Sequence, residues 1–412
     1  MHRRTTTLLV ICALAAALPG SFAHAVDGDG GSSGGGKGDG TVVLPGIPER
    51  LSPRQKCTTF TGRPTAEAPW TRHALGLDRV WPLSQGRGVT VAVVGTGVSD
   101  APAVLAGRVR ALGDADEDCV GRGTFQAGLI AGARAPGQGF SGVAPEARIL
   151  AVRGTGVRGE NDPARLAAGI EEAAKAGAGV ITLTAPLSGT DASVKAALAV
   201  ASREDALVVA PAAADSAPPG ADGAGAPKPA PAPPPDVLSV LDTGPQGTRP
   251  DTAPPYTRAD LTAPGVSLVG PGPRGDGKWT GSGASLAAAV TAGTAALVRS
   301  YHPELTAAQV RARLLRTAYP ADLPALDPYG AVAGAATRAG ATVAGPRPAP
   351  VRLPVPPDTS ASRNTALLVA AGAAATAALV ALLAVVLPRG RARRWAPGRL
   401  EGHDERAGGK AA

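Results

Sequence analysis

Gly95, Thr96 and Gly97 follow an apolar run and have the composition of a ligand-binding turn. The run Val89–Val94 (VTVAVV) has the length of a buried strand, and the three residues come directly after it. A strand followed by the pattern G-x-G-x-x-G would bind the pyrophosphate of a dinucleotide through backbone N–H groups. Asp100 stands where this pattern requires its third glycine. The sequence therefore predicts no dinucleotide cofactor.

Cysteines and acidic residues could form a cross-link or hold a metal. The chain has three cysteines, of which Cys12 lies in a segment that we expect to be removed on export. Cys57 and Cys119 then remain in an oxidising compartment, where a pair favours a disulfide over two free thiols. The acidic stretch Asp114–Asp118 is most often a solvated loop, and a calcium site is the alternative. Two lone cysteines do not indicate a metal site, so we expect no bound metal.

The N-terminus has the pattern of a signal peptide at residues 1–25. Arg3 and Arg4 precede an apolar run, Leu8–Leu18, and the triplet at 23–25 supplies the small residues of a cleavage site. The run is too short to span a bilayer. The mature chain would then begin near Val26.

A second apolar segment predicts a transmembrane helix at residues 365–387. Ala366–Leu387 contains no charged residue, and as a helix it would be about 30 Å long. The alternative is a buried core helix. A basic cluster follows the segment: Arg389, Arg391, Arg393, Arg394 and Arg399. Because such a cluster marks the cytoplasmic side of a membrane span, we expect a single-pass protein of the cell membrane, with an extracellular domain and a basic cytoplasmic tail at 388–412.

Composition divides the rest of the chain into linkers and one large domain. The glycine-rich residues 26–44 predict a flexible linker, and the proline-rich residues 344–364 predict a semi-rigid spacer. Residues 45–343 would form the folded domain, with an exposed Ala/Pro/Gly-rich insertion at 214–235. Much of the net charge of +8 lies at the two ends, beside apolar segments. No basic stripe with interleaved aromatics is present, so we expect no nucleic-acid partner.

Short apolar runs alternate with helical patterns through the domain. Strands are predicted at 89–94, 149–152, 180–184 and 206–210, and a helix at 193–202. Asp162 before Pro163 has the pattern of a helix cap, and Gly177 would end that helix. The alternation predicts an α/β fold, in which a parallel sheet has helices on both faces.

Five short motifs occur in an order that resembles the subtilases, the family of subtilisin-like serine proteases. The first, Val91–Val98 (VAVVGTGV), resembles the strand that ends in the family's D-T-G turn. The others are Gly121–Thr124 (GRGT) with Ala127-Gly128, similar to G-H-G-T…A-G; Gly142–Ala147 (GVAPEA); Ala263–Gly265 (APG); and Gly283–Leu286 (GASL) with Ala292-Gly293, similar to G-T-S-[MF]…A-G. The resemblance implies a subtilisin-like parallel sheet.

Within the subtilases the chain resembles the mycosins, which are membrane-anchored proteases associated with type VII secretion. The shared features are a signal peptide, an N-terminal extension, Cys119 just before the G-H-G-T segment, a proline-rich spacer and a C-terminal span. The resemblance implies a membrane location and, as partners, components of type VII secretion or a peptide ligand.

The catalytic positions that the resemblance implies carry the wrong residues. A subtilase uses an aspartate to orient a histidine, which takes the proton of the serine nucleophile. Gly95 stands at the aspartate position and Arg122 at the histidine position, so only Ser285 is retained. The family's oxyanion asparagine is missing from Val208–Asp215 (VVAPAAAD), and its S-x-G-G stretch reads Thr184–Leu187 (TAPL).

No other residue is expected to replace the base. Arginine stays protonated in proteins, so we expect Arg122 to be a solvated or salt-bridged surface residue, with binding of a carboxylate or a C-terminus as the alternative. Of the five histidines, only His73 and His302 fall in the extracellular domain, and neither is expected to reach Ser285. Ser285 itself lies at a strand-to-helix junction, where we expect it to cap the helix.

These observations predict a catalytically inactive subtilase homologue, or pseudoprotease, that binds or scaffolds at the membrane. The alternative is an active serine endopeptidase with an unorthodox base, which requires a carboxylate or a neutral lysine within hydrogen-bond reach of Ser285. A third interpretation is a sequence that is losing its function.

Overall fold

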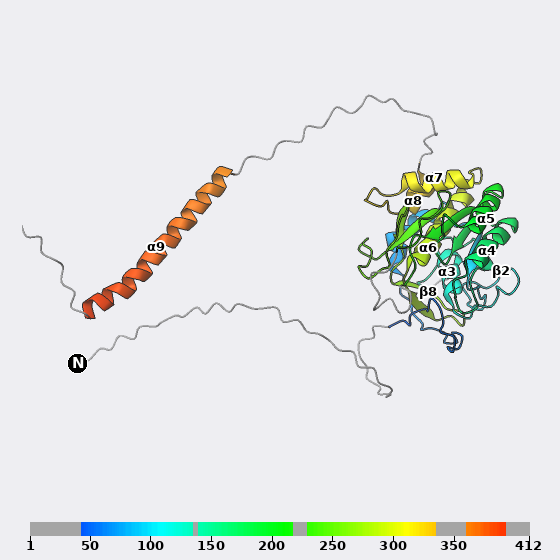
Figure 1. Cartoon of the computed structure of the whole chain (residues 1–412), viewed down its shortest axis with the longest axis horizontal. Helices are drawn as coiled ribbons and strands as arrows, with labels where there is room; N and C mark the ends of the chain where they lie inside the picture. Colours follow the sequence, from blue (N-terminus) through cyan, green and yellow to red (C-terminus); the bar gives the residue numbers. More distant parts are fainter. Residues whose placement is uncertain (1–42, 135–138, 217–228, 335–359, 393–412) are drawn as a thin grey trace, which may run out of the picture. The chain divides into compact units, whose positions relative to one another are not determined.

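A computed structural model describes residues 43–134, 139–216, 229–334 and 360–392 (Figure 1). The chain divides into two units, residues 1–336 and 337–412. The expected signal peptide, nearly all of the glycine-rich linker, most of the proline-rich spacer and most of the cytoplasmic tail lie outside the described residues.

A seven-stranded parallel sheet forms the centre of the first unit, with the strand order β2-β3-β1-β4-β5-β6-β7. Its strands are β1 (Thr90–Gly95), β2 (Val109–Ala111), β3 (Arg148–Arg153), β4 (Val180–Leu183), β5 (Leu207–Pro211), β6 (Leu238–Thr243) and β7 (Leu261–Pro264). The four predicted strands correspond to β1, β3, β4 and β5. All four are mostly apolar and are buried along nearly their whole length, which is the pattern of strands covered on both faces.

Helices cover both faces of this sheet. They are α3 (Arg122–Ala131), α4 (Pro163–Lys175), α5 (Ala192–Arg203) and α6 (Ala284–Tyr301). Alternate residues of β1 face opposite ways, because side chains alternate along a strand. Val91 and Val93 join the core that contains α3 and α6, whereas Ala92 and Val94 join the core that contains α4 and α5. Figure 1 shows α4 and α5 side by side, and the predicted α/β fold is confirmed.

Local signals explain where the outer helices begin and end. Asp162 accepts a hydrogen bond from the backbone N–H of Arg165 at 3.1 Å, and Pro163 is the first residue of α4, as predicted. Asp191 caps α5 in the same way. Gly177 follows α4 with a φ of +83°, a conformation that costs glycine little.

Smaller elements complete the unit around the sheet. They are the helices α1 (Trp70–Ala74), α2 (Leu77–Val80), α7 (Ala307–Thr317) and α8 (Pro328–Ala333), and an antiparallel hairpin of β8 (Leu268–Pro271) and β9 (Lys278–Gly281). The predicted disulfide joins Cys57 to Cys119 and attaches the N-terminal extension to the segment before α3.

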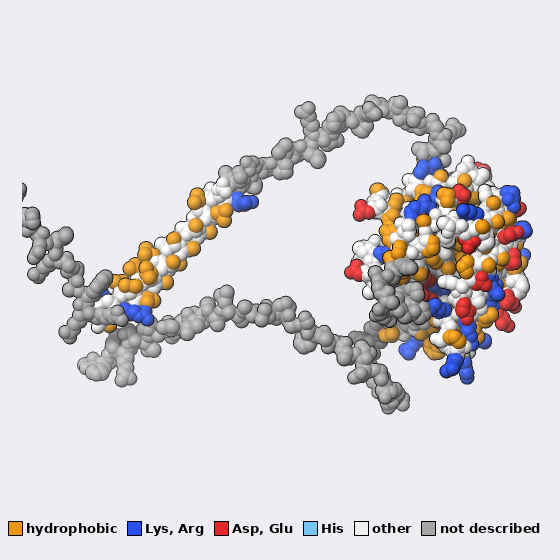
Figure 2. All heavy atoms as spheres, viewed as in Figure 1, with side chains coloured by type: hydrophobic (Ala, Val, Ile, Leu, Met, Phe, Trp, Pro, Cys, Tyr) orange, Lys and Arg blue, Asp and Glu red, His pale blue; other side chains and the backbone are white. Residues whose placement is uncertain are grey.

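The second unit contains one long helix, α9 (Ser360–Ala392). Within it, Arg363–Ala392 contains an 18-residue window with a mean hydropathy of 2.4, and this window is not buried. Figure 2 shows apolar side chains along this helix and arginines near its two ends. The predicted span at 365–387 lies inside α9, which continues beyond it into the first residues of the expected tail. The helix is therefore a candidate membrane span by length and composition.

Candidate active site

Four segments of the first unit meet at the carboxyl end of the sheet. Gly95 is the last residue of β1, and Asp215 follows β5 by four residues. Arg122 begins α3, and Ser285 is the second residue of α6. Loops that follow parallel strands gather at this edge of a sheet, where α/β proteins bind their ligands. Side chains far apart in the sequence are thereby brought into direct contact.

Asp215 binds both hydrogen-bond donors of Ser285. Its Oδ1 accepts the backbone N–H of Ser285 at 2.7 Å, and its Oδ2 accepts the hydroxyl proton at 2.5 Å. The Ser285 N–H belongs to the first turn of α6, where backbone donors lack partners within the helix. The positive end of the helix dipole also favours a carboxylate at this place. The carboxylate is thus held by the same helix that presents the serine.

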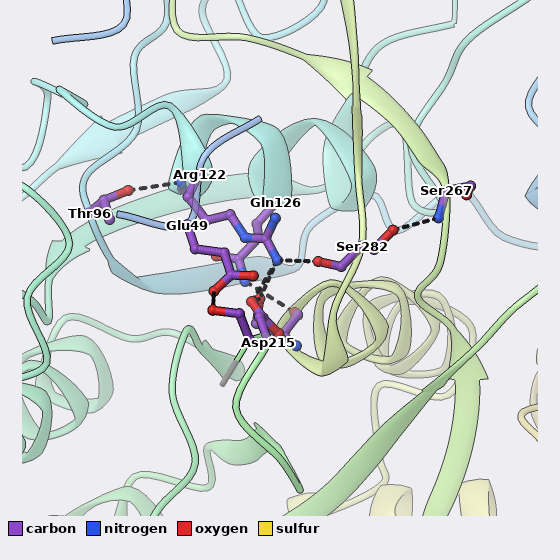
Figure 3. A network of polar contacts seen from close by, with 10 residues as sticks. Glu49, Thr96, Arg122, Gln126, Asp215, Ser267 and Ser282 are labelled. Atoms are coloured by element: carbon purple, nitrogen blue, oxygen red, sulfur yellow. Dashed lines mark hydrogen bonds and ion pairs between the residues drawn. The ribbon is translucent and has the colours of Figure 1, made fainter. Parts of the chain in front are cut away.

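Arg122 supplies the charge that balances Asp215. Its Nη2 lies 2.5 Å from Asp215 Oδ2, 2.8 Å from the carbonyl oxygen of Ser282 and 3.3 Å from Ser285 Oγ. The side chains of Arg122 and Asp215 are 3% and 7% exposed, so the ion pair is buried. In Figure 3, Arg122 reaches across the site towards Asp215 and Ser282. Arg122 is therefore salt-bridged, but the expectation that it lies at the surface was wrong, because a partner 93 residues away lets the charge be buried.

Asp118 fixes the start of the helix that carries Arg122. It accepts hydrogen bonds from the N–H groups of Gly121 and Thr124 at 2.7 and 2.8 Å, and from the Thr124 hydroxyl at 2.7 Å. Burial is the largest influence on this carboxyl and raises its pKa, and the hydrogen bonds oppose that effect. The expectation of a solvated loop was wrong for Asp118, which is buried and accepts backbone N–H groups at the start of α3.

The start of α6 also differs from the prediction. Gly283, and not Ser285, is the residue that precedes the helix, and Ser285 lies inside the first turn. Gly283 has a φ of +135°, a conformation nearly restricted to glycine. A Cβ atom at this position would lie 2.3 Å from Asp215 Oδ1. Glycine is needed here because the carboxylate of Asp215 takes the space beside it.

Gly95 is packed against the strand next to it. A Cβ atom at Gly95 would lie only 2.3 Å from Cγ2 of Thr184. The Thr184 methyl group therefore fills the place where a longer side chain at position 95 would start. Gly95 makes no polar contact with Arg122 or Ser285. The side chains of those two residues contact each other instead.

A polar cavity of about 200 Å³ opens beside this network. Its walls include Thr184–Pro186, Asn161, Arg122 and Asp215, together with Glu49 and Arg50 from the N-terminal extension. Glu49 Oε2 accepts a hydrogen bond from the Ser216 hydroxyl at 2.6 Å. Burial, and then the negative charge of Asp215, raise the pKa of Glu49.

The two histidines of the described domain lie away from this network. His302 follows the last residue of α6, at the opposite end from Ser285 and about 25 Å along the helix axis. Its Nε2 contacts the carbonyl oxygen of Val332. His73 is exposed on α1. The described residues contain no cluster of three or more acidic, histidine or cysteine side chains able to hold a metal.

The network gives Ser285 a carboxylate neighbour but leaves it no free N–H. In serine hydrolases, the backbone N–H of the nucleophile helps to bind the oxyanion of the intermediate. Here that N–H is bonded to Asp215 Oδ1, and the carboxylate brings a negative charge to the place where the oxyanion would form. Sequence reasoning missed this role of Asp215, although the residue ends the segment Val208–Asp215 in which an oxyanion donor was sought.

Comparison with known proteins relates the chain to one family. A model described as the subtilase family of peptidases matches residues 86–342. Mycosin-4 of Mycobacterium tuberculosis is 32% identical over 409 aligned residues, which cover 87% of this chain and 90% of mycosin-4. The structure of MycP3 protease from the type VII (ESX-3) secretion system is 32% identical with a TM-score of 0.56, covering 70% of this chain and 95% of that one. A chain of an intact ESX-5 inner membrane complex is 25% identical with a TM-score of 0.56, covering 84% of this chain and 96% of that one.

Proposed function

Because the chain belongs to the subtilase family, we propose that it is a mycosin-like homologue without peptidase activity, which acts by binding other molecules at the membrane near a type VII secretion machinery. One observation carries the proposal. The carboxylate of Asp215 is bonded to the N–H and the hydroxyl of Ser285, so a substrate carbonyl has no free backbone donor at the serine.

The residues at the expected catalytic positions support inactivity. Gly95 stands where the family's motif has an aspartate, and Arg122 stands where it has a histidine. A guanidinium cannot accept a proton from Ser285. Loss of triad members in subtilisin lowers kcat by about a million-fold, and loss of an oxyanion donor lowers it by about a hundred-fold or more.

The alternative is an active serine endopeptidase in which Asp215 is the base. The distance of 2.5 Å between Asp215 Oδ2 and Ser285 Oγ favours it, because a base must lie within hydrogen-bond reach. Two features oppose it. Asp215 is paired with Arg122, and its other oxygen occupies the serine N–H that would bind an oxyanion. A second negative charge developing there would be repelled, so we rank this alternative below the inactive one.

The apolar helix α9 and the related structures support a place at the membrane. We infer that α9 anchors the chain with the subtilase unit outside the cell and the basic C-terminal residues in the cytoplasm, because basic residues after a span favour the inner side. Relatives named from type VII secretion systems, including a chain of an inner membrane complex, support a partner of that kind.

The proposal is tested in the organism that carries the gene. Deletion should impair type VII secretion, and a copy encoding Ser285→Ala should restore it fully, because the role is binding and not turnover. Restoration by the unaltered gene but not by Ser285→Ala would contradict the proposal. No defect on deletion would favour a sequence that is losing its function.

A further inference from the structure

We propose that the cavity beside Arg122 binds a peptide that presents a carboxylate to the guanidinium and an apolar side chain to the neighbouring pocket. The inference rests on the proposed function, since it names the ligand of a site that does not cleave. The peptide carboxylate can be its C-terminus or an acidic side chain, and the experiment below separates the two.

Arg122 lines the cavity and has N–H groups that lack a hydrogen-bond partner. A guanidinium carries five N–H donors. All three hydrogen-bond contacts of Arg122, to Asp215, Ser282 and Ser285, use Nη2. Its Nε is buried without a partner, and Nη1 has no hydrogen-bond partner among the described residues. A buried donor without a partner is costly, so a carboxylate that completes the guanidinium would be bound with a charge-assisted hydrogen bond.

The other charged groups on the wall are compatible with an anionic ligand. Arg50 adds a positive charge, and the negative charge of Asp215 is paired with Arg122. Glu49 is the carboxyl group of the wall that has no such pairing. Burial and Asp215 raise its pKa, Ser216, Arg122 and Arg50 oppose them, and the net effect favours the protonated form. A protonated Glu49 carboxyl can donate a hydrogen bond to the ligand. Binding should therefore weaken as the pH rises and Glu49 ionises, and Glu49→Gln should remove this dependence.

A second pocket continues the cavity and is more apolar. Its volume is about 190 Å³, and its walls include Leu166, Leu187 and Val194. The two spaces share four wall residues: Thr155, Asn161, Ala185 and Pro186. An extended peptide could therefore place an apolar side chain in the second pocket while its carboxylate contacts Arg122. This pairing of an apolar anchor with one placed charge is typical of ligand sites.

The test uses the full chain in detergent and acetylated alanine hexapeptides with one leucine at each of the first five positions in turn. Each peptide is made with a free C-terminal carboxylate, with a C-terminal amide, or as an amide with glutamate as its last residue. Calorimetry or fluorescence anisotropy gives the dissociation constants. We expect at least one carboxylate form to bind about tenfold tighter than the matching neutral amide, with a preferred leucine position. The carboxylate form whose affinity exceeds that of the neutral amide by the larger factor shows whether the site prefers a C-terminus or an acidic side chain.

Three variants connect this preference to the site. Arg122→Gln combined with Asp215→Asn removes both buried charges together, and the carboxylate preference should disappear. Asn161→Trp, at an exposed residue shared by both spaces, should weaken every peptide while leaving the ion pair intact. Arg203→Gln removes an exposed arginine on α5 and should change nothing.

Neutral amides that bind as tightly as carboxylates would overturn the inference, as would a carboxylate preference that survives in the double variant. Absence of binding for all peptides at about 1 mM would also overturn it. These results leave the inactivity of Ser285 untouched, because that is measured by covalent labelling, so the failure of either proposal can be told from that of the other.

Discussion

Asp215 and Ser285 form a closed pair in which one carboxylate accepts both the backbone N–H and the hydroxyl proton of the serine, at 2.7 and 2.5 Å. The two residues lie 70 positions apart and approach only because the loop after β5 and the start of α6 meet at one edge of the sheet. The N–H and the hydroxyl that the serine of a peptidase offers to its substrate are here both bonded to Asp215.

The buried ion pair predicts a coupled effect on stability. Arg122→Gln or Asp215→Asn alone should lower the free energy of unfolding by about 3–5 kcal/mol, because each leaves the other charge buried and unpaired. The double variant should recover most of this loss. Denaturant unfolding of the four proteins gives the coupling energy, and Arg203→Gln, an exposed control, should stay within about 0.5 kcal/mol of the unaltered chain. Strictly additive losses would show that the two side chains do not form the pair described.

The packing of Thr184 on Gly95 predicts that a side chain at position 95 is tolerated only when the Thr184 methyl group is removed. Gly95→Ala should cost about 1–3 kcal/mol, because its Cβ meets the Thr184 methyl group. Adding Thr184→Ser, which removes that methyl and keeps the hydroxyl, should cancel most of the cost. Thermal unfolding of both variants and of Thr184→Ser alone tests this. An equal cost of Gly95→Ala in both backgrounds would mean that Thr184 is not the obstacle.

Glu49 predicts a pH-dependent contribution to stability. Its pKa is raised above the ordinary value of 4.5 by burial and by Asp215. The stability that its protonated form provides is complete below that ordinary value and is lost as the pH rises through the raised pKa. Glu49→Gln should therefore gain stability over the unaltered chain at neutral pH, with the difference fading in acid.

The Ser216 hydroxyl supplies the matched control for Glu49. Its hydrogen bond lowers the pKa of Glu49, so Ser216→Ala should raise that pKa further and move the transition to higher pH. An NMR titration of the Glu49 carboxyl in both proteins gives the values. A shift to lower pH in Ser216→Ala, or a stability difference between Glu49→Gln and the unaltered chain that does not vary with pH, would contradict the assignment.

Signals between residues close together in the sequence predicted strands and helices of the central sheet layer and its covering helices. The apolar run before Gly95 became β1, and Asp162 with Pro163 began α4, because strand burial and helix capping depend on residues close together in the chain. The disulfide Cys57–Cys119 was also predicted, from cysteine number and compartment. The hairpin of β8 and β9 was not predicted.

The contacts of the site depended on residues far apart in the chain. Arg122 was expected at the surface, since a charged side chain is seldom fully buried unless it is paired, and its partner lies 93 residues away. Its partner Asp215 is the second residue of the Ala/Pro/Gly-rich insertion that was expected to be exposed, yet its side chain is 7% exposed. Ser285 was expected to cap α6, but its side chain is bonded to Asp215 instead. The sequence did hold one signal for this contact. Asp215 is a carboxylate that follows the strand β5 by four residues, in the segment where the family's oxyanion donor was sought.

Covalent labelling of Ser285 tests the central claim most directly. The full chain in detergent is incubated with a fluorophosphonate probe, beside an active subtilisin and beside Ser285→Ala. We expect the subtilisin to be labelled, and the chain and its Ser285→Ala variant to remain equally unlabelled, because Asp215 occupies the donors of Ser285 and no histidine of the described domain can reach it. Labelling of the chain that Ser285→Ala abolishes would contradict the claim and establish Ser285 as a working nucleophile.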